Sequence, residues 1–151
     1  MMRRFLLIAL GLVATGAFSA TASAGPHFVT ASKTISNGTL TVSFKEAGLG
    51  NTQTVTIQVS ATVTATYQCV NKGGNVPKDP KKTTRTTVVA KSGIFTSDKN
   101  GNVVGSLTLT APPPPADFVC PPGQTATLLA GSVTFTNVVI TDTTTGAVAN
   151  P

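Results

Sequence analysis

The chain has 151 residues, of which 40% are hydrophobic and only 11% are charged, and its formal net charge is +6. This composition excludes an intrinsically disordered chain, which needs high charge and few β-branched residues. Abundant Thr, Val and Gly instead indicate β-structure, in a chain long enough for one domain with a sizeable core.

The first residues have the organisation of a secretory signal peptide. Arg3 and Arg4 precede the apolar run 5–13, and Ala22 and Ala24 have the spacing of a small-residue cleavage site. The apolar run is too short for the roughly 20 residues of a membrane-spanning helix. We therefore expect residues 1–24 to be removed and residues 25–151 to form a secreted domain. The C-terminal stretch TTTGAVANP has no apolar tail, so we expect no membrane attachment after cleavage.

Alternation of apolar and polar residues predicts a series of strands in the mature chain. The predicted strands are 27–32, 39–44, 55–69, 86–97, 103–110, 125–131 and 132–141. The longest, 55–69, exceeds the usual strand length, so a bend or bulge near Ala61 should let it serve two strand pairings. A phase switch at Asn137 predicts a β-bulge. The Asn-Gly pairs at 37–38 and 100–101 predict hairpins.

Two irregular segments interrupt the strands. The first, 70–85, is rich in glycine, proline and lysine, and the second, 111–124, has a run of four prolines that cannot pair in a central strand. Cys69 and Cys120 lie at or in these segments. In a secreted protein two cysteines are expected to pair, although two free thiols remain the alternative. These features predict an all-β fold: a single immunoglobulin-like antiparallel β-sandwich with one disulfide.

Several motifs together resemble a family of small secreted proteins, found mainly in actinobacteria, that has no assigned activity. They are FKEAGLGN, ATYQCVNKGGNVP, GSLTL, CPPGQ and VTFTNVVITDTTTG, which cover nearly all of the mature chain. The resemblance implies secretion and the pairing of Cys69 with Cys120. It implies no catalytic or ligand-binding residue.

Residues for catalysis or metal binding are sparse, and we expect a non-enzymatic protein without metal or cofactor. The single histidine, His27, follows Pro26, which has no amide proton for an N-terminal copper site. The segment DKNGN at 98–102 has too few oxygen ligands for calcium and is interpreted as a turn. All five carboxylates are expected in or beside turns, which gives little support to a hydrolase. They are Glu46, Asp79, Asp98, Asp117 and Asp142.

Basic residues within the first irregular segment are the leading candidate site. They are Lys72, Lys78, Lys81, Lys82 and Arg85, with Asp79 as the one acid among them. Such a cluster can attract anionic polysaccharide or another cell-wall polymer, although it can also be a solvated loop. Specific nucleic-acid recognition is not expected, because no groove-reading helix or base-stacking aromatic cluster accompanies the charge.

A protease inhibitor is the alternative function. Here the proline-stiffened segment 112–122 would be a preorganised loop that docks into an enzyme cleft. Phe118 and Val119, next to Cys120, would make the contacts.

Overall fold

The structure is a computed structural model that describes residues 24–151. The expected signal peptide therefore lies almost wholly outside the described residues. Eight strands form in the described part: β1 (His27–Ser36), β2 (Thr39–Ala47), β3 (Thr54–Asn71), β4 (Lys82–Thr96), β5 (Val103–Thr110), β6 (Gln124–Leu128), β7 (Thr134–Asp142) and β8 (Val148–Ala149). Residues 24–151 contain no helix, and hence none able to cross a membrane.

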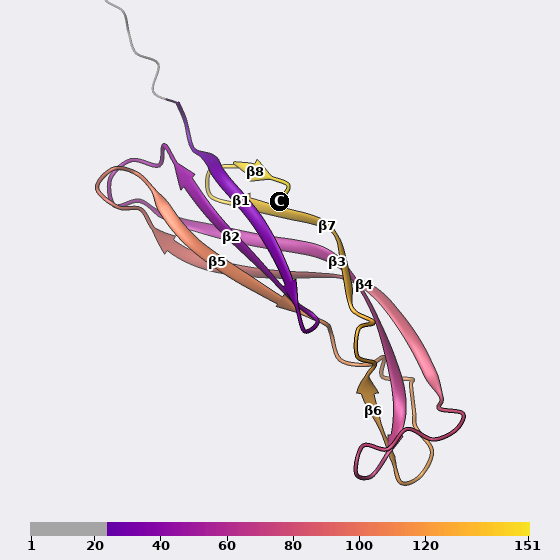
Figure 1. Ribbon diagram of the computed structural model, residues 1–151. Helices are drawn as coiled ribbons and strands as arrows, with labels where there is room; N and C mark the ends of the chain where they lie inside the picture. Colours follow the sequence, from indigo (N-terminus) through magenta and orange to yellow (C-terminus); the bar gives the residue numbers. More distant parts are fainter. Residues whose placement is uncertain (1–23) are drawn as a thin grey trace, which may run out of the picture.

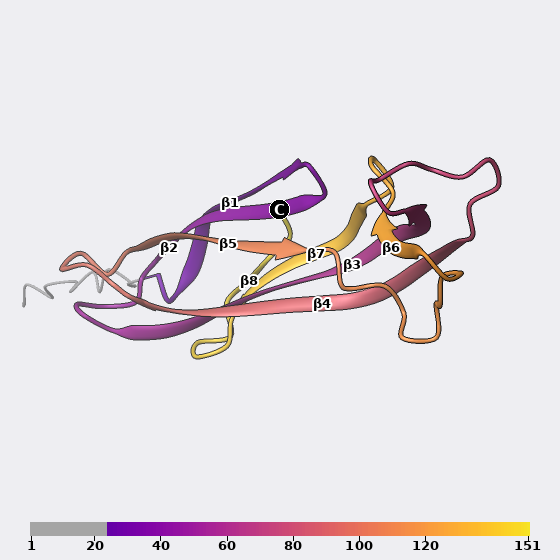
Figure 2. The ribbon, with the colours of Figure 1, turned by 90° about the horizontal axis from the view of Figure 1, so that it is seen from below.

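The strands form two antiparallel sheets that pack on each other (Figure 1; Figure 2). One sheet has the order β1-β2-β5, and the other has the order β4-β3-β7-β8, with β6 beside the far end of β3. The predicted all-β sandwich is confirmed. The long β3–β4 hairpin extends well beyond the smaller sheet, so the molecule has a sandwich body and a narrow extension (Figure 1).

Strand β3 is central because its alternating sequence places one complete row of side chains inside. Every second residue from Val55 to Cys69 is buried, and the polar residues between them face outward. On one edge β3 pairs with β4 from Thr54 to Gln68. On its other edge β3 pairs first with β7 and then with β6, so the expectation that one segment serves two strand pairings is confirmed.

Two local expectations about backbone geometry are confirmed. The register between β3 and β7 shifts between Ser60 and Thr62, where Asn137 adopts a φ of 50°. This is the predicted bulge, and it turns both Phe135 and Val138 into the core. Asn37 and Gly38 join the paired strands β1 and β2 with positive φ angles at both positions, as a tight two-residue hairpin requires.

The second Asn-Gly pair does not form a hairpin between paired strands. β4 pairs with β3 and β5 pairs with β2, so the segment around Asn100 and Gly101 crosses between the sheets. Its turn is set by Asp98, whose carboxylate accepts hydrogen bonds from the amides of Asn100 (2.8 Å) and Asn102 (2.9 Å). Hydrogen bonds from the Asn102 and Asn100 amides lower the pKa of Asp98. The prediction was wrong because local turn chemistry does not specify which strands pair.

Three phenylalanines stack inside the body. Phe44 lies edge-on to Phe28, with ring centroids 5.9 Å apart, and to Phe95, with centroids 5.2 Å apart. Phe28 and Phe95 both pack against the core. Gly105 makes room for this stack, because a Cβ atom there would lie 2.5 Å from Cε1 of Phe95 and 3.0 Å from Cζ of Phe44.

Gly105→Ala should therefore lower the free energy of unfolding by about 1–3 kcal/mol, since the added methyl group overpacks a close-packed core. Urea denaturation followed by circular dichroism would measure this change. Gly25→Ala is the control, because no atom of residues 24–151 outside its chain neighbours lies within 4 Å of a Cβ atom there. Equal stability of the two variants would show that the stack can move aside freely.

Candidate functional site

The candidate site is on the extension of the molecule, here called the distal arm. It comprises residues 64–86 of the β3–β4 hairpin and its loop, strand β6, and the proline-rich segment 111–123 (Figure 1). The main hydrophobic core includes β3 residues only as far as Val63. Beyond that point Ala65, Tyr67 and Cys69 are nevertheless buried. The arm thus has a small core of its own, and the Tyr67 hydroxyl donates a hydrogen bond to the Pro112 carbonyl.

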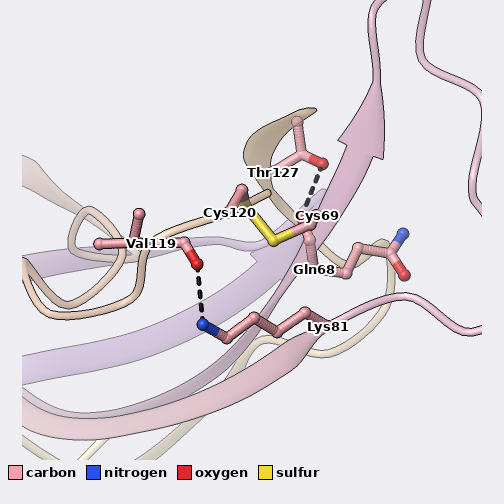
Figure 3. The surroundings of a disulfide bond; sticks show 6 residues. All are labelled: Gln68, Cys69, Lys81, Val119, Cys120 and Thr127. Carbon is pink, nitrogen blue, oxygen red and sulfur yellow. Dashed lines mark hydrogen bonds between the residues drawn. A yellow bond between two sulfur atoms is a disulfide. The ribbon is translucent and has the colours of Figure 1, made fainter. Parts of the chain in front are cut away.

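The disulfide joins this small core to the proline-rich segment. Cys69 of β3 bonds to Cys120, with Cα atoms 5.6 Å apart and 51 residues of sequence separation (Figure 3). Cys69 is completely buried. The predicted pairing of the two cysteines is confirmed. The bond holds in place a segment whose prolines cannot donate backbone hydrogen bonds to a sheet.

Two of the five predicted cations brace the proline-rich segment. Lys81 Nζ donates to the Val119 carbonyl (2.8 Å; Figure 3) and lies 5.5 Å from the centroid of the Phe118 ring. Arg85 Nη1 donates to the Pro113 carbonyl at 2.9 Å. A proline-rich segment has many carbonyl acceptors and few amide donors. Lys81 and Arg85 therefore supply donors that the neighbouring backbone lacks.

The pKa of the Tyr67 hydroxyl is consistent with its role as a donor to the proline-rich segment. Burial raises the pKa of the Tyr67 hydroxyl, and the positive charge of Arg85 partly offsets the rise. The hydroxyl therefore stays protonated at neutral pH and remains a hydrogen-bond donor to the proline-rich segment.

The other three cations, Lys72, Lys78 and Lys82, are exposed. Among residues 24–151 their ammonium groups make no hydrogen bond or ion pair. Lys82 begins β4 on its outward face, whereas Arg85 lies in the opposite phase of the same strand. The interpretation of 70–85 as one irregular loop was therefore wrong at its end, because Lys82 and Arg85 belong to a strand. The structure brings all five cations to one arm but leaves three free for a partner.

The two residues expected for protease inhibition are placed differently from each other. Val119 is 68% exposed, whereas Phe118 is half-buried beneath Lys81. The Phe118 amide bonds to the Pro115 carbonyl (3.0 Å) and the Val119 amide to the Asp117 carbonyl (3.1 Å), so the segment is turned rather than extended. Inhibition stays a prediction, with Val119 as the more accessible contact residue.

A buried carboxyl pair was missed by the sequence analysis. Glu46 of β2 and Asp142 of β7 are both 0% exposed, although both were expected beside turns. Asp142 accepts hydrogen bonds from the Thr144 amide (2.8 Å) and the Thr145 hydroxyl (2.7 Å). Within the described part of the chain, neither Glu46 carboxyl oxygen accepts a hydrogen bond. Burial and the negative charge of Asp142 raise the pKa of Glu46 to about 7.

The alternation of inward and outward residues along β2 and β7 could have predicted that both acids are buried. Glu46 continues the inward phase of Val42 and Phe44, and Asp142 continues the inward phase of Val138 and Ile140. The remaining acids, Asp79, Asp98 and Asp117, are exposed, as is His27. Across residues 24–151, no group of three or more His, Cys, Asp or Glu side chains is arranged to hold a metal ion.

An apolar pocket of about 470 Å³ lies where the arm meets the body. It is formed between the β1–β2 turn and the segment 128–133, with Ile35 and Leu128 at its walls. Both of these side chains are partly exposed.

The body and the braced arm together define a small, disulfide-linked, all-β sandwich protein. Comparison of the chain with protein-family models, with curated proteins and with solved structures finds no match. The resemblance to small secreted actinobacterial proteins stays a prediction.

Proposed function

We propose that the chain is a secreted, non-catalytic binding protein whose distal arm associates with anionic polymers of the cell envelope or extracellular matrix. The observation that carries this proposal is the set of exposed, unpaired ammonium groups of Lys72, Lys78 and Lys82. They lie on an arm whose shape is held by a disulfide and by two further cations. A rigid cationic surface loses little conformational entropy on binding.

Secretion and the finer architecture are part of the same proposal. A disulfide is compatible with an oxidising, extracellular compartment. The strand orders β1-β2-β5 and β4-β3-β7-β8 support an immunoglobulin-like arrangement, in which the second sheet corresponds to strands C′, C, F and G. Binding modules commonly use the ends of such sandwiches, where loops gather on a rigid scaffold.

The binding would be driven by the release of counterions from the polymer, so it should weaken steeply with salt. With three lysines engaged, we expect affinity for dextran sulfate to fall about 20- to 40-fold between 50 and 200 mM salt, and binding to uncharged dextran to be absent. The triple variant Lys72→Ala, Lys78→Ala, Lys82→Ala should lose most of this affinity and most of its salt dependence. Fluorescence titration with labelled polymer would measure both.

A matched variant separates a local site from net charge. Lys45, Lys91 and Lys99 are also exposed but lie on the body, and their replacement by alanine removes the same charge. That variant should bind nearly as well as the wild type. Equal losses in the two triple variants would overturn the distal arm as the site and leave only a general attraction of a basic protein.

A further inference from the structure

The buried pair Glu46 and Asp142 has no part in polymer binding, yet it is unusual. The two carboxyl groups come from facing sheets, both residues are buried, and Asp142 is close enough to raise the pKa of Glu46. Asp142 accepts hydrogen bonds from the Thr144 and Thr145 amides and from the Thr145 hydroxyl. Within residues 24–151 neither Glu46 oxygen accepts a hydrogen bond, although the Thr145 hydroxyl is close enough to lower the Glu46 pKa somewhat. Two ionised carboxylates have no hydrogen to donate to each other. A hydrogen bond between them therefore requires that one of the two is protonated.

One proton resolves this conflict. A protonated Glu46 donates a hydrogen bond to the Asp142 carboxylate, which removes both the like-charge repulsion and the unsatisfied buried group. Among residues 24–151, no Lys, Arg or His side chain makes a hydrogen bond or ion pair with either carboxyl group. β3 and β5 carry no charged residue, and β7 carries only Asp142. The charged residues of β1 and of the rest of β2, namely His27, Lys33 and Lys45, are exposed, and Lys33 donates to the carbonyl of Pro151 at the chain end beyond β8.

Asp142, which accepts this proton's hydrogen bond, also holds the turn that leads to β8 near the end of the chain. Its carboxylate and backbone organise the turn to β8, where the Asp142 amide donates to the Ala147 carbonyl and the Gly146 amide donates to the Asp142 carbonyl, each at 2.8 Å. β8 itself has two residues, which pair only with Ile140 and Thr141 of β7. The turn is also joined to β3 by hydrogen bonds of Thr143 and Thr144 with Thr56, and Ala149 packs against the core, so opening must break these contacts as well.

We propose that a proton shared by Glu46 and Asp142 is a latch that closes β8 and its turn onto the sandwich, and that the latch holds more tightly in mildly acidic than in neutral solution. When the proton leaves, two buried negative charges face each other. Release of the 142–149 turn relieves this repulsion by letting water reach Asp142, and it uncovers the edge of β7.

The direction of the pH effect follows from linkage. The pKa of Glu46 is about 7 with the latch closed and returns toward 4.5 when it opens. Between these values the closed state holds one more proton than the open state, so the opening constant rises about tenfold per pH unit. Above pH 7 both states have lost the proton, and the opening constant becomes constant.

Hydrogen–deuterium exchange tests the latch. After correction for intrinsic exchange rates, the protection of the Asp142, Thr144 and Gly146 amides should fall about fiftyfold from pH 5 to pH 7.5. Glu46→Gln should keep the high protection at both pH values, because its amide donates to Asp142 without titrating. An equal fall in Glu46→Gln, or constant protection in the wild type, would overturn the proposal.

Two further measurements make the result specific. If Glu46→Gln does not fold, Asp142→Asn removes the charge that faces Glu46 and supplies a donor to it, so protection should fall clearly less between pH 5 and pH 7.5 than in the wild type; a residual fall remains because Glu46 is still buried and still titrates. Amides of β3 at 66–71 serve as a reference within each sample, and an equal change there would mean global unfolding instead of a local latch. Protection restored at pH 7.5 by added Ca²⁺ in the wild type alone would assign the pair to a cation and overturn the proton latch.

Discussion

Replacing Cys69 and Cys120 together with alanine should lower the free energy of unfolding by about 4 kcal/mol. The bond closes a loop across a separation of 51 residues, and its removal restores the corresponding conformational freedom to the unfolded chain. Urea denaturation measures the loss. Tyrosine fluorescence is well suited to it, because the chain has one tyrosine and no tryptophan, and Tyr67 lies in the distal arm.

The double variant also shows what else holds the arm. Circular dichroism should still report a folded β-sandwich under native conditions, because the body has its own core. A loss of stability below about 1 kcal/mol would contradict the prediction, and would assign the bracing chiefly to Lys81, Arg85 and the packing around Tyr67.

Phe44→Ala should be similarly costly, at about 3–5 kcal/mol, because it deletes the central ring of the aromatic stack and leaves a cavity. Phe44 is only 3% exposed. Phe118→Ala is the matched control, since that ring is half-buried in the arm, and it should cost far less. Thermal unfolding of both variants would test this. Similar melting temperatures for the two variants would mean that the stack adds little to the body.

Much of the fold could be predicted from the sequence, because the alternation of apolar and polar residues along a strand shows which side chains face inward. The alternation identified the buried face of β3 and the bulge at Asn137, and the two-residue turn at Asn37 followed from φ preferences. Strand pairing was not accessible in the same way. The chain around Asn100 has hairpin chemistry, but its neighbours pair in different sheets, which depends on contacts far away in the sequence.

The candidate site was predicted in part for a similar reason. Lys72 to Arg85 are close in sequence, so their proximity on one arm needed no tertiary information. Which of these cations brace the arm and which stay free did need tertiary information. The carbonyl groups that accept from Lys81 and Arg85 belong to Val119 and Pro113, in a segment that the fold brings alongside. The Glu46–Asp142 pair was missed because acids next to turn residues are usually exposed, and this assumption outweighed the alternation.

The length of β3 has a mechanical consequence. One uninterrupted strand runs from the body into the distal arm and is hydrogen-bonded along its length to β4, with β7 and β6 on its other edge. Because the loop at the arm tip joins β3 to β4, tension between the tip and the body pulls both strands in the same direction and loads the hydrogen bonds of β3 to β7 in shear. The arm is therefore expected to move with the body as one stiff unit, because β3 belongs to both.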